Sequence, residues 1–152
     1  KLTSALLKAG LSMAMCGNSR PASGSEHHQS HFLEMDFARR GLPIPAHGVK
    51  VGLGTMLSLE LYHHLSMAKV PCRECEKVWA LADTLPSPDD VRRLLAGVGC
   101  PVRFRDIGVT RDQMRQMLAG AHTVRDRYTV LTLYAELGLT ERLAELLIDK
   151  YY

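Results

Sequence analysis

The sequence predicts an all-α multi-helix bundle, built as one domain of seven to nine helices. Its 152 residues are the length of one ordinary domain. Apolar residues recur with helical spacing along nearly the whole chain, and no alternating run is long enough for a sheet. Hydrophobic residues make up 46% and charged residues 23%, which excludes a collagen, a disordered tail and a disulfide-dense miniprotein.

Three helices are expected in the first half of the chain. Residues 2–15 are apolar on most sides, so this first helix should be buried. The second helix runs from a capping box at 23–26 to about Arg40, because Ser23 and Glu26 have the spacing of that motif. The third covers about 48–68. Glycines near its start cost about 1 kcal/mol each relative to Ala, which indicates close approach of another backbone or a ligand: Gly48, Gly52 and Gly54.

Capping and turn residues divide the second half into five further helices. A helix begins near Cys72 and ends before Pro86, and the next follows the cap Ser87-Pro88. Thr110 and Gln113 form a capping box. The remaining helices are predicted at 111–121, 128–137 and 140–149. The leucines of the tail predict an apolar surface that favours a homodimer of the full-length protein: Leu133, Leu137, Leu139, Leu143 and Leu147.

The ends and the cysteines indicate a cytoplasmic protein. Residues 1–15 resemble a signal peptide, but Lys8 interrupts the apolar run and no cleavage site follows. The chain opens inside a helix without a capping residue, which is typical of a chain that starts within a longer protein. No run of 18 uncharged apolar residues predicts a membrane span. Cys72 and Cys75 lack the second pair that a structural zinc site needs.

Several histidines cluster in the first half of the chain. His27 and His31 are four residues apart and share a helix face, whereas His28 points about 100° away. His47 follows a proline-rich turn, and two antiparallel helices joined by this turn bring it back towards the second helix. Imidazole pairs of this kind suit Zn, Ni or Fe, so we expect a metal site. Capping or surface roles are expected for the others: His63, His64 and His122.

The string Ser-Arg-Pro-Ala-Ser-Gly-Ser-Glu-His at residues 19–27 is specific. Together with His31, His47-Gly48 and Arg-Asp-Arg-Tyr-Thr at 125–129, it resembles the sn-glycerol-1-phosphate dehydrogenases, the bacterial branch in particular. These belong to the iron-containing alcohol dehydrogenase and dehydroquinate synthase superfamily. The resemblance implies that residues 1–152 are the helical metal- and substrate-binding domain. It implies that the NAD(P)-binding domain lies outside this chain.

The resemblance also implies roles for individual residues. His27 and His47 correspond to two ligands of a divalent metal, and the third, an aspartate, lies upstream of the matched region. His31 is a candidate catalytic residue that relays a proton near neutral pH. The small phosphorylated substrate needs cationic donors, for which Arg20 and Lys50 are candidates. The implied reaction is NAD(P)H-dependent reduction of dihydroxyacetone phosphate to sn-glycerol 1-phosphate.

Two other functional classes remain open at this stage. A glycerol dehydrogenase or dehydroquinate synthase-like enzyme would share the metal site but differ in its dependence on substrate phosphate. A non-enzymatic helical module would bind a partner through basic residues. We expect neither nucleic acid nor a membrane as a partner, since the net charge is only +3 and acidic residues interrupt the basic ones: Arg103, Arg105, Arg111 and Arg115.

Overall fold

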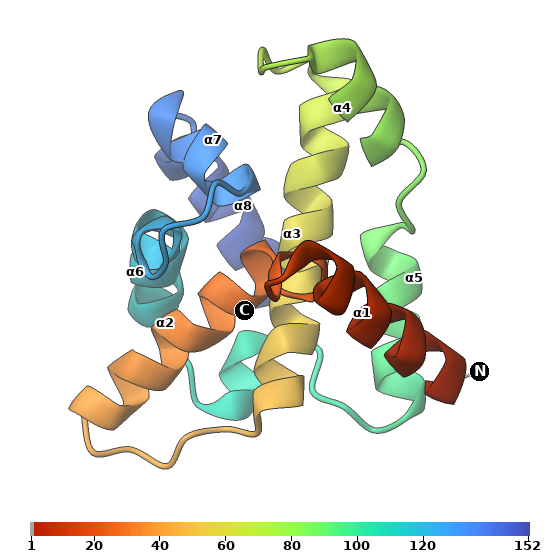
Figure 1. The fold of residues 1–152 in the computed structure, drawn as a ribbon. Helices are drawn as coiled ribbons and strands as arrows, with labels where there is room; N and C mark the ends of the chain where they lie inside the picture. The colour runs from red at the N-terminus through yellow and green to blue at the C-terminus, as the bar shows by residue number, and fades with distance from the viewer. Residues whose placement is uncertain (1) are drawn as a thin grey trace.

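The computed structural model describes residues 2–152, which form eight α-helices, three short 3₁₀ helices and no β-strand. Lys1, the basic start of the first predicted segment, lies outside this range. The all-α prediction is confirmed. The α-helices are α1 Leu2–Cys16, α2 Ser25–Arg39, α3 His47–Met67, α4 Cys75–Ala82, α5 Pro88–Gly97, α6 Arg111–Gly120, α7 Val130–Glu136 and α8 Thr140–Tyr151 (Figure 1). The 3₁₀ helices are η1 Arg20–Ala22, η2 Phe104–Ile107 and η3 Ala121–Thr123.

Helix α3 runs through the middle of the molecule and organises its core (Figure 1). It contacts α2, α4, α5 and α7, and its contact with α2 is the most extensive between any two described elements. Its apolar side chains recur at helical spacing and are buried: Leu53, Met56, Leu57, Leu61 and Leu65. The two helices that carry the candidate histidines are therefore held together by the core of the domain.

At Gly54 the backbone of α3 lies close to the backbone of α2. A Cβ at this position would lie 2.9 Å from the backbone oxygen of Glu26, nearer than atoms of side chains approach backbone. At Gly52 a Cβ would meet only the side chain of Leu95, and at Gly48 it would meet nothing within 4 Å. The predicted close approach of another backbone is thus confirmed at Gly54 and absent at Gly48.

Two of the predicted helix caps are confirmed and one is wrong. The Ser87 side chain accepts a hydrogen bond from the backbone of Asp90, and Thr110 forms its capping box. At the start of α2 the N-cap is Gly24, not Ser23, because Ser23 closes the preceding turn η1. The Gly24 N–H instead donates to Glu26 Oε1 at 2.7 Å.

The prediction that the first helix is buried is wrong. The main contacts of α1 are with the neighbouring η1. Its apolar side chains reach 80% exposure at Met15, and Leu6, Leu7 and Leu11 are exposed as well. The reason lies in its sequence: apolar residues surround the helix, and a helix of this kind needs cover on every side. Within the described residues, α1 is partly covered only around its middle, at Ala9, Gly10, Ser12 and Met13.

The tail leucines do not form the uncovered surface expected from the sequence. Leu133 and Leu147 are buried in the core, and Leu139 and Leu143 pack against it. Only Leu137 of the predicted set is exposed. Helix α8 closes the domain's own core through contacts with α6 and α7. The predicted homodimer remains untested, and these leucines no longer support it.

The remaining sequence expectations concern the membrane and the thiols. No helix within residues 2–152 is long and apolar enough to span a membrane.

All four cysteines are free thiols. Helix α4 begins at Cys75 rather than near Cys72, because the cap residue Glu74 adopts a left-handed conformation with φ of 53°.

Asp36 fixes α2 to α6 from a nearly fully buried position, at 3% exposure. Its carboxylate accepts hydrogen bonds from Gln113 at 2.7 Å, Arg40 at 2.8 Å and Arg39 at 2.6 Å. Burial by itself would raise the pKa of Asp36, but these hydrogen bonds outweigh burial and lower the pKa below its ordinary value. The ionised carboxylate therefore stabilises the fold.

Asp36→Ala is expected to lower the free energy of unfolding by about 1–3 kcal/mol, because the buried amide of Gln113 loses its partner. The difference from wild type should be complete above pH 4, the region of the unfolded pKa, and should shrink as the pH falls through the lowered folded pKa. Urea denaturation at pH 7 and at pH 3 measures both effects. An equal difference at the two pH values would contradict the electrostatic role.

Candidate metal centre

Three imidazole rings from two helices converge at one end of the α2–α3 contact. Their centroids are separated by 5.4 Å for His27 and His47, 5.8 Å for His31 and His47, and 6.5 Å for His27 and His31. His27 and His31 lie one turn apart on α2, and His47 is the first residue of α3. The turn between the helices brings His47 back to this face, as the sequence predicts.

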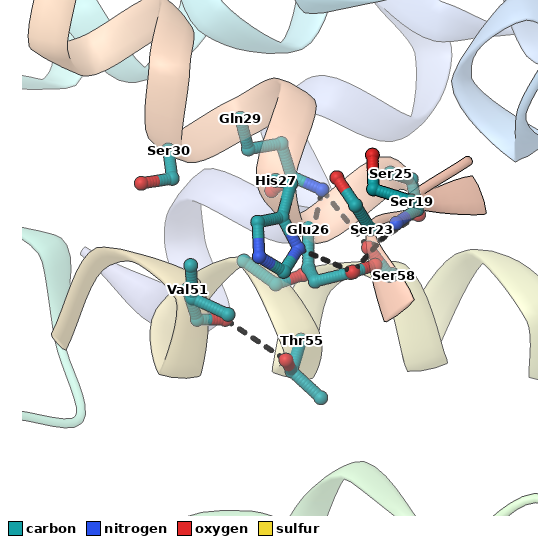
Figure 2. A network of polar contacts seen from close by, with 12 residues as sticks. Ser19, Ser23, Ser25, Glu26, His27, Gln29, Ser30, Val51, Thr55 and Ser58 are labelled. Carbon is teal, nitrogen blue, oxygen red and sulfur yellow. Dashed lines mark hydrogen bonds and ion pairs between the residues drawn. The ribbon is translucent and has the colours of Figure 1, made fainter. Parts of the chain in front are cut away.

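His27 and His47 share one hydrogen-bonding pattern. His27 Nδ1 lies 2.7 Å from Glu26 Oε1, and His47 Nδ1 lies 3.1 Å from Glu34 Oε1. Figure 2 shows the His27 ring beside Glu26 on the side of α2 that faces α3. An ionised carboxylate only accepts, so each Nδ1 carries the proton. Neither Nε2 has a hydrogen-bond partner within the described residues, which leaves a lone pair on each ring available to a metal.

His31 differs from these two because both of its ring nitrogens are engaged. Nδ1 lies 2.9 Å from Glu34 Oε2, and Nε2 lies 2.9 Å from an Nη2 donor of Arg125. Since Arg125 only donates, Nε2 is the acceptor and the ring is neutral with its proton on Nδ1. His31 therefore adjoins the candidate ligands without offering a free nitrogen of its own.

Glu34 is the residue of this site that sequence reasoning missed. It accepts hydrogen bonds from His31 and His47 and lies 3.2 Å from the ammonium of Lys50. Desolvation would raise its pKa, but the hydrogen bonds from His47, His31 and Lys50 together lower the pKa of Glu34 to about 2. The available signal in the sequence was its position three residues after His31 on a predicted helix.

Lys50, a predicted phosphate-binding residue, is only 1% exposed. Its Nζ donates to the backbone oxygen of Pro45 and pairs with Glu34. The Lys50 ammonium thus balances the negative charge of the Glu34 carboxylate. An incoming phosphate would have to displace Glu34 in order to reach it.

The other histidines lie outside the cluster. His28 is fully buried, and neither ring nitrogen has a partner within the described residues. Burial, with the nearby charges of Arg125 and Arg127, lowers the pKa of His28, so the ring is neutral. His63 contacts the Pro86 carbonyl and His64 contacts the Tyr134 hydroxyl. His122 Nδ1 is buried without a partner among these residues.

A cavity of about 170 Å³ lies at the start of α2, next to the histidine cluster. It is lined by residues from the two segments that carry the family-like strings: Arg20, Ser23, Gly24, Arg127, Tyr128 and Thr129. Arg127 donates to Ser19 Oγ at 2.8 Å and to the Ser23 carbonyl at 3.2 Å, which ties the two segments together. The guanidinium of Arg20 makes no hydrogen bond to another described residue. Gly24 connects the cavity to His27, because Glu26 Oε1 accepts from both residues.

A larger cavity, of about 690 Å³, lies between α3, α4 and α7, and none of the predicted site residues lines it. Within residues 2–152 no three His, Cys, Asp or Glu side chains form a complete metal-binding group. Among the described residues, the cluster of His27, His31 and His47 therefore offers two unengaged Nε2 atoms, those of His27 and His47, and not a full ligand set.

Comparison with known proteins finds glycerol-1-phosphate dehydrogenases among the relatives of this chain. The chain is 38% identical over 143 residues to a glycerol-1-phosphate dehydrogenase of Halalkalibacterium halodurans, whose name carries NAD(P)+. The chain is related to the glycerol-1-phosphate dehydrogenases. The protein of the same name from Bacillus subtilis is 36% identical over 89% of this chain, and that from Methanococcus aeolicus is 31% identical over 99%. No family model matches the chain.

The match covers most of this chain but a smaller part of each relative. It spans 86% of this chain and 36% of the Halalkalibacterium protein, and 39% of the Methanococcus protein. The chain thus corresponds to a little over a third of the length of the glycerol-1-phosphate dehydrogenases that it matches. The resemblance inferred from the histidine string is confirmed over the part of each relative that the chain spans.

Proposed function

We propose that this chain forms the metal- and substrate-binding helical half of an NAD(P)-linked sn-glycerol-1-phosphate dehydrogenase. The observation that carries the proposal is the pair of Nε2 atoms of His27 and His47, each on a ring whose Nδ1 faces a carboxylate. Metal-ligating histidines characteristically donate their second ring N–H to a carboxylate or carbonyl. The relatives' names, which contain glycerol 1-phosphate and NAD(P)+, support a dehydrogenase of this class; the reduction of dihydroxyacetone phosphate is the corresponding reverse reaction.

The residues present fit a divalent Zn, Ni or Fe ion. His27 and His47 would supply two imidazole nitrogens, and an aspartate outside these 152 residues would supply the third ligand. When bound, the ion provides a Lewis acid that polarises the carbonyl oxygen of the substrate. Glu26 and Glu34 hold the two rings in the tautomer that leaves Nε2 unprotonated.

His31 is the proposed proton donor to the substrate oxygen. Its Nδ1 proton is held by Glu34, and its Nε2 accepts from Arg125 in the observed arrangement. Proton transfer through Nε2 therefore requires Arg125 to turn away from the ring and Nε2 to take up a proton from solvent, so that the imidazolium can pass that proton to the substrate oxygen and return to the neutral Nδ1–H form. Arg125 is exposed, so this movement displaces no buried side chain.

The cavity lined by Arg20 and Arg127 is the proposed site of the substrate phosphate. Arg20 is the better candidate of the two residues expected from the sequence, because its guanidinium is uncommitted whereas Lys50 is buried against Glu34. Guanidinium groups form strong charge-assisted hydrogen bonds with phosphate. Lys50 is instead proposed to act indirectly, by forming an ion pair with Glu34.

Arg20→Gln in the complete protein is expected to raise KM for dihydroxyacetone phosphate about tenfold or more, since a hydrogen bond to a charged group contributes about 1.5–3 kcal/mol. KM for dihydroxyacetone, which lacks the phosphate, should stay unchanged. Arg115→Gln is the matched control, because Arg115 pairs with Glu145 on the surface. Equal losses for both substrates would contradict a phosphate contact.

The proposed function is tested by coenzyme oxidation in the complete protein. We expect NADH- or NADPH-dependent reduction of dihydroxyacetone phosphate that chelation abolishes and added Zn²⁺, Ni²⁺ or Fe²⁺ restores. The 152 residues alone should be inactive, because the proposal places the coenzyme domain outside them. Activity on dihydroxyacetone without activity on dihydroxyacetone phosphate would contradict the proposal. So would activity that resists exhaustive chelation.

A further inference from the structure

We propose that Glu34 is a positioning residue that sets the tautomers of His31 and His47 together, an inference that rests on the proposed function. Its two carboxylate oxygens face different rings: Oε2 lies 2.9 Å from His31 Nδ1, and Oε1 lies 3.1 Å from His47 Nδ1. One side chain on α2 thereby orients the proton donor and a metal ligand that belongs to α3. This role goes beyond the predicted ligands and donor.

The position of Glu34 suits this task. Its carboxylate is 28% exposed and is backed by the ammonium of Lys50 at 3.2 Å, so its negative charge is balanced by a cation on the same side. Lys50 follows His47 by one turn of α3, and α2 and α3 are packed together through the core. The carboxylate is therefore held between two helices that do not move independently.

The tautomer determines what each ring can do. An imidazole with its proton on Nδ1 has an unprotonated Nε2, which can bind a metal or accept a proton. A His47 ring with the opposite tautomer would direct an N–H at the metal and could not ligate it. Ser30 Oγ, at 3.4 Å from His47 Nδ1, is a hydroxyl that can donate or accept, so it does not select the tautomer.

Glu34→Gln tests the proposal with little change in shape. Glutamine places one acceptor oxygen and one donor nitrogen where the glutamate has two acceptors. A ring that faces the amide nitrogen must turn its Nδ1 into an acceptor, so at least one of the two rings should switch to the Nε2–H tautomer. Glu60→Gln is the matched control: Glu60 accepts hydrogen bonds from Lys150 and Tyr151 and has no hydrogen bond to a histidine among the described residues.

The readout is the ¹⁵N chemical shifts of the histidine rings in the metal-free chain. Wild type and Glu60→Gln are expected to hold His31 and His47 in the Nδ1–H tautomer, and Glu34→Gln is expected to lose it in at least one ring. Metal affinity of the complete protein should fall by about 10–100-fold in Glu34→Gln, the range for loss of an outer-shell partner.

Two outcomes would overturn the proposal. One is the Nε2–H tautomer on His47 or His31 in the wild-type chain, a result that needs no variant to fold. The other is an unchanged Nδ1–H tautomer on both rings in Glu34→Gln. The tautomer measurement involves neither metal nor coenzyme, so its failure is distinguishable from failure of the proposed dehydrogenase activity.

Discussion

His27→Ala and His47→Ala in the complete protein are each expected to lose bound metal and dehydrogenase activity together. Each change removes one of the two imidazole nitrogens available at the site. Loss of an outer-shell partner lowers metal affinity by about 10–100-fold. Loss of a ligand itself should lower metal affinity by more than this. Metal content after gel filtration and the rate of coenzyme oxidation are the two measurements.

Two further histidines serve as controls for this result. His63→Ala should retain both metal and activity, because the His63 ring on α3 hydrogen-bonds to the Pro86 carbonyl and not to a residue of the histidine cluster. His28→Ala removes a fully buried ring, so its main effect should be on the free energy of unfolding. Loss of metal in His28→Ala with retention in His27→Ala would show that the ligand face of α2 is wrongly assigned.

Gly54→Ala is expected to destabilise the domain and to weaken the metal site at the same time. The new Cβ would lie 2.9 Å from the Glu26 carbonyl oxygen, a backbone atom that cannot rotate away. Overpacking of this kind costs about 1–3 kcal/mol, which exceeds the gain of about 1 kcal/mol from replacing a helical glycine. The start of α2 must shift, and His27 moves with it relative to His47.

Gly48→Ala provides the matched comparison on the same helix. A Cβ there meets nothing within 4 Å, so the free energy of unfolding should stay level or rise by up to about 1 kcal/mol. Chemical denaturation of the two variants and wild type measures the difference. Gly54→Ala at least as stable as Gly48→Ala would contradict the close approach of α2 to α3.

The helical architecture was predictable because its signals are local. Periodic apolar residues and caps such as Ser87 and Thr110 act within one or two turns, and the structure confirms both caps. The cap at Ser23 was mispredicted because Ser23 is the C-cap of η1, a 3₁₀ helix with a proline in its first positions. Burial of α1 was mispredicted because an apolar sequence pattern indicates that a helix favours burial but does not indicate which neighbouring element covers it.

The candidate site was predictable only as far as residue type and helix phase extend. The spacing of His27 and His31 and the turn before His47 predict that the rings converge, and their centroids lie within 6.5 Å. Two of the contacts that define the roles of the rings are tertiary. Glu34 reaches His47 on the next helix, and Arg125 reaches His31 across 94 positions of sequence, so no local pattern indicates these two contacts. The contact of Glu34 with His31 is local, since the two residues are three apart on α2.

X-ray absorption at the metal edge of the complete, metal-loaded protein tests the central claim most directly, because it counts imidazole ligands. We predict two imidazoles in the first coordination shell, from His27 and His47, and an unchanged count in His31→Ala, since both nitrogens of His31 are already engaged. A first shell without imidazole, or one that loses an imidazole in His31→Ala, would contradict this assignment.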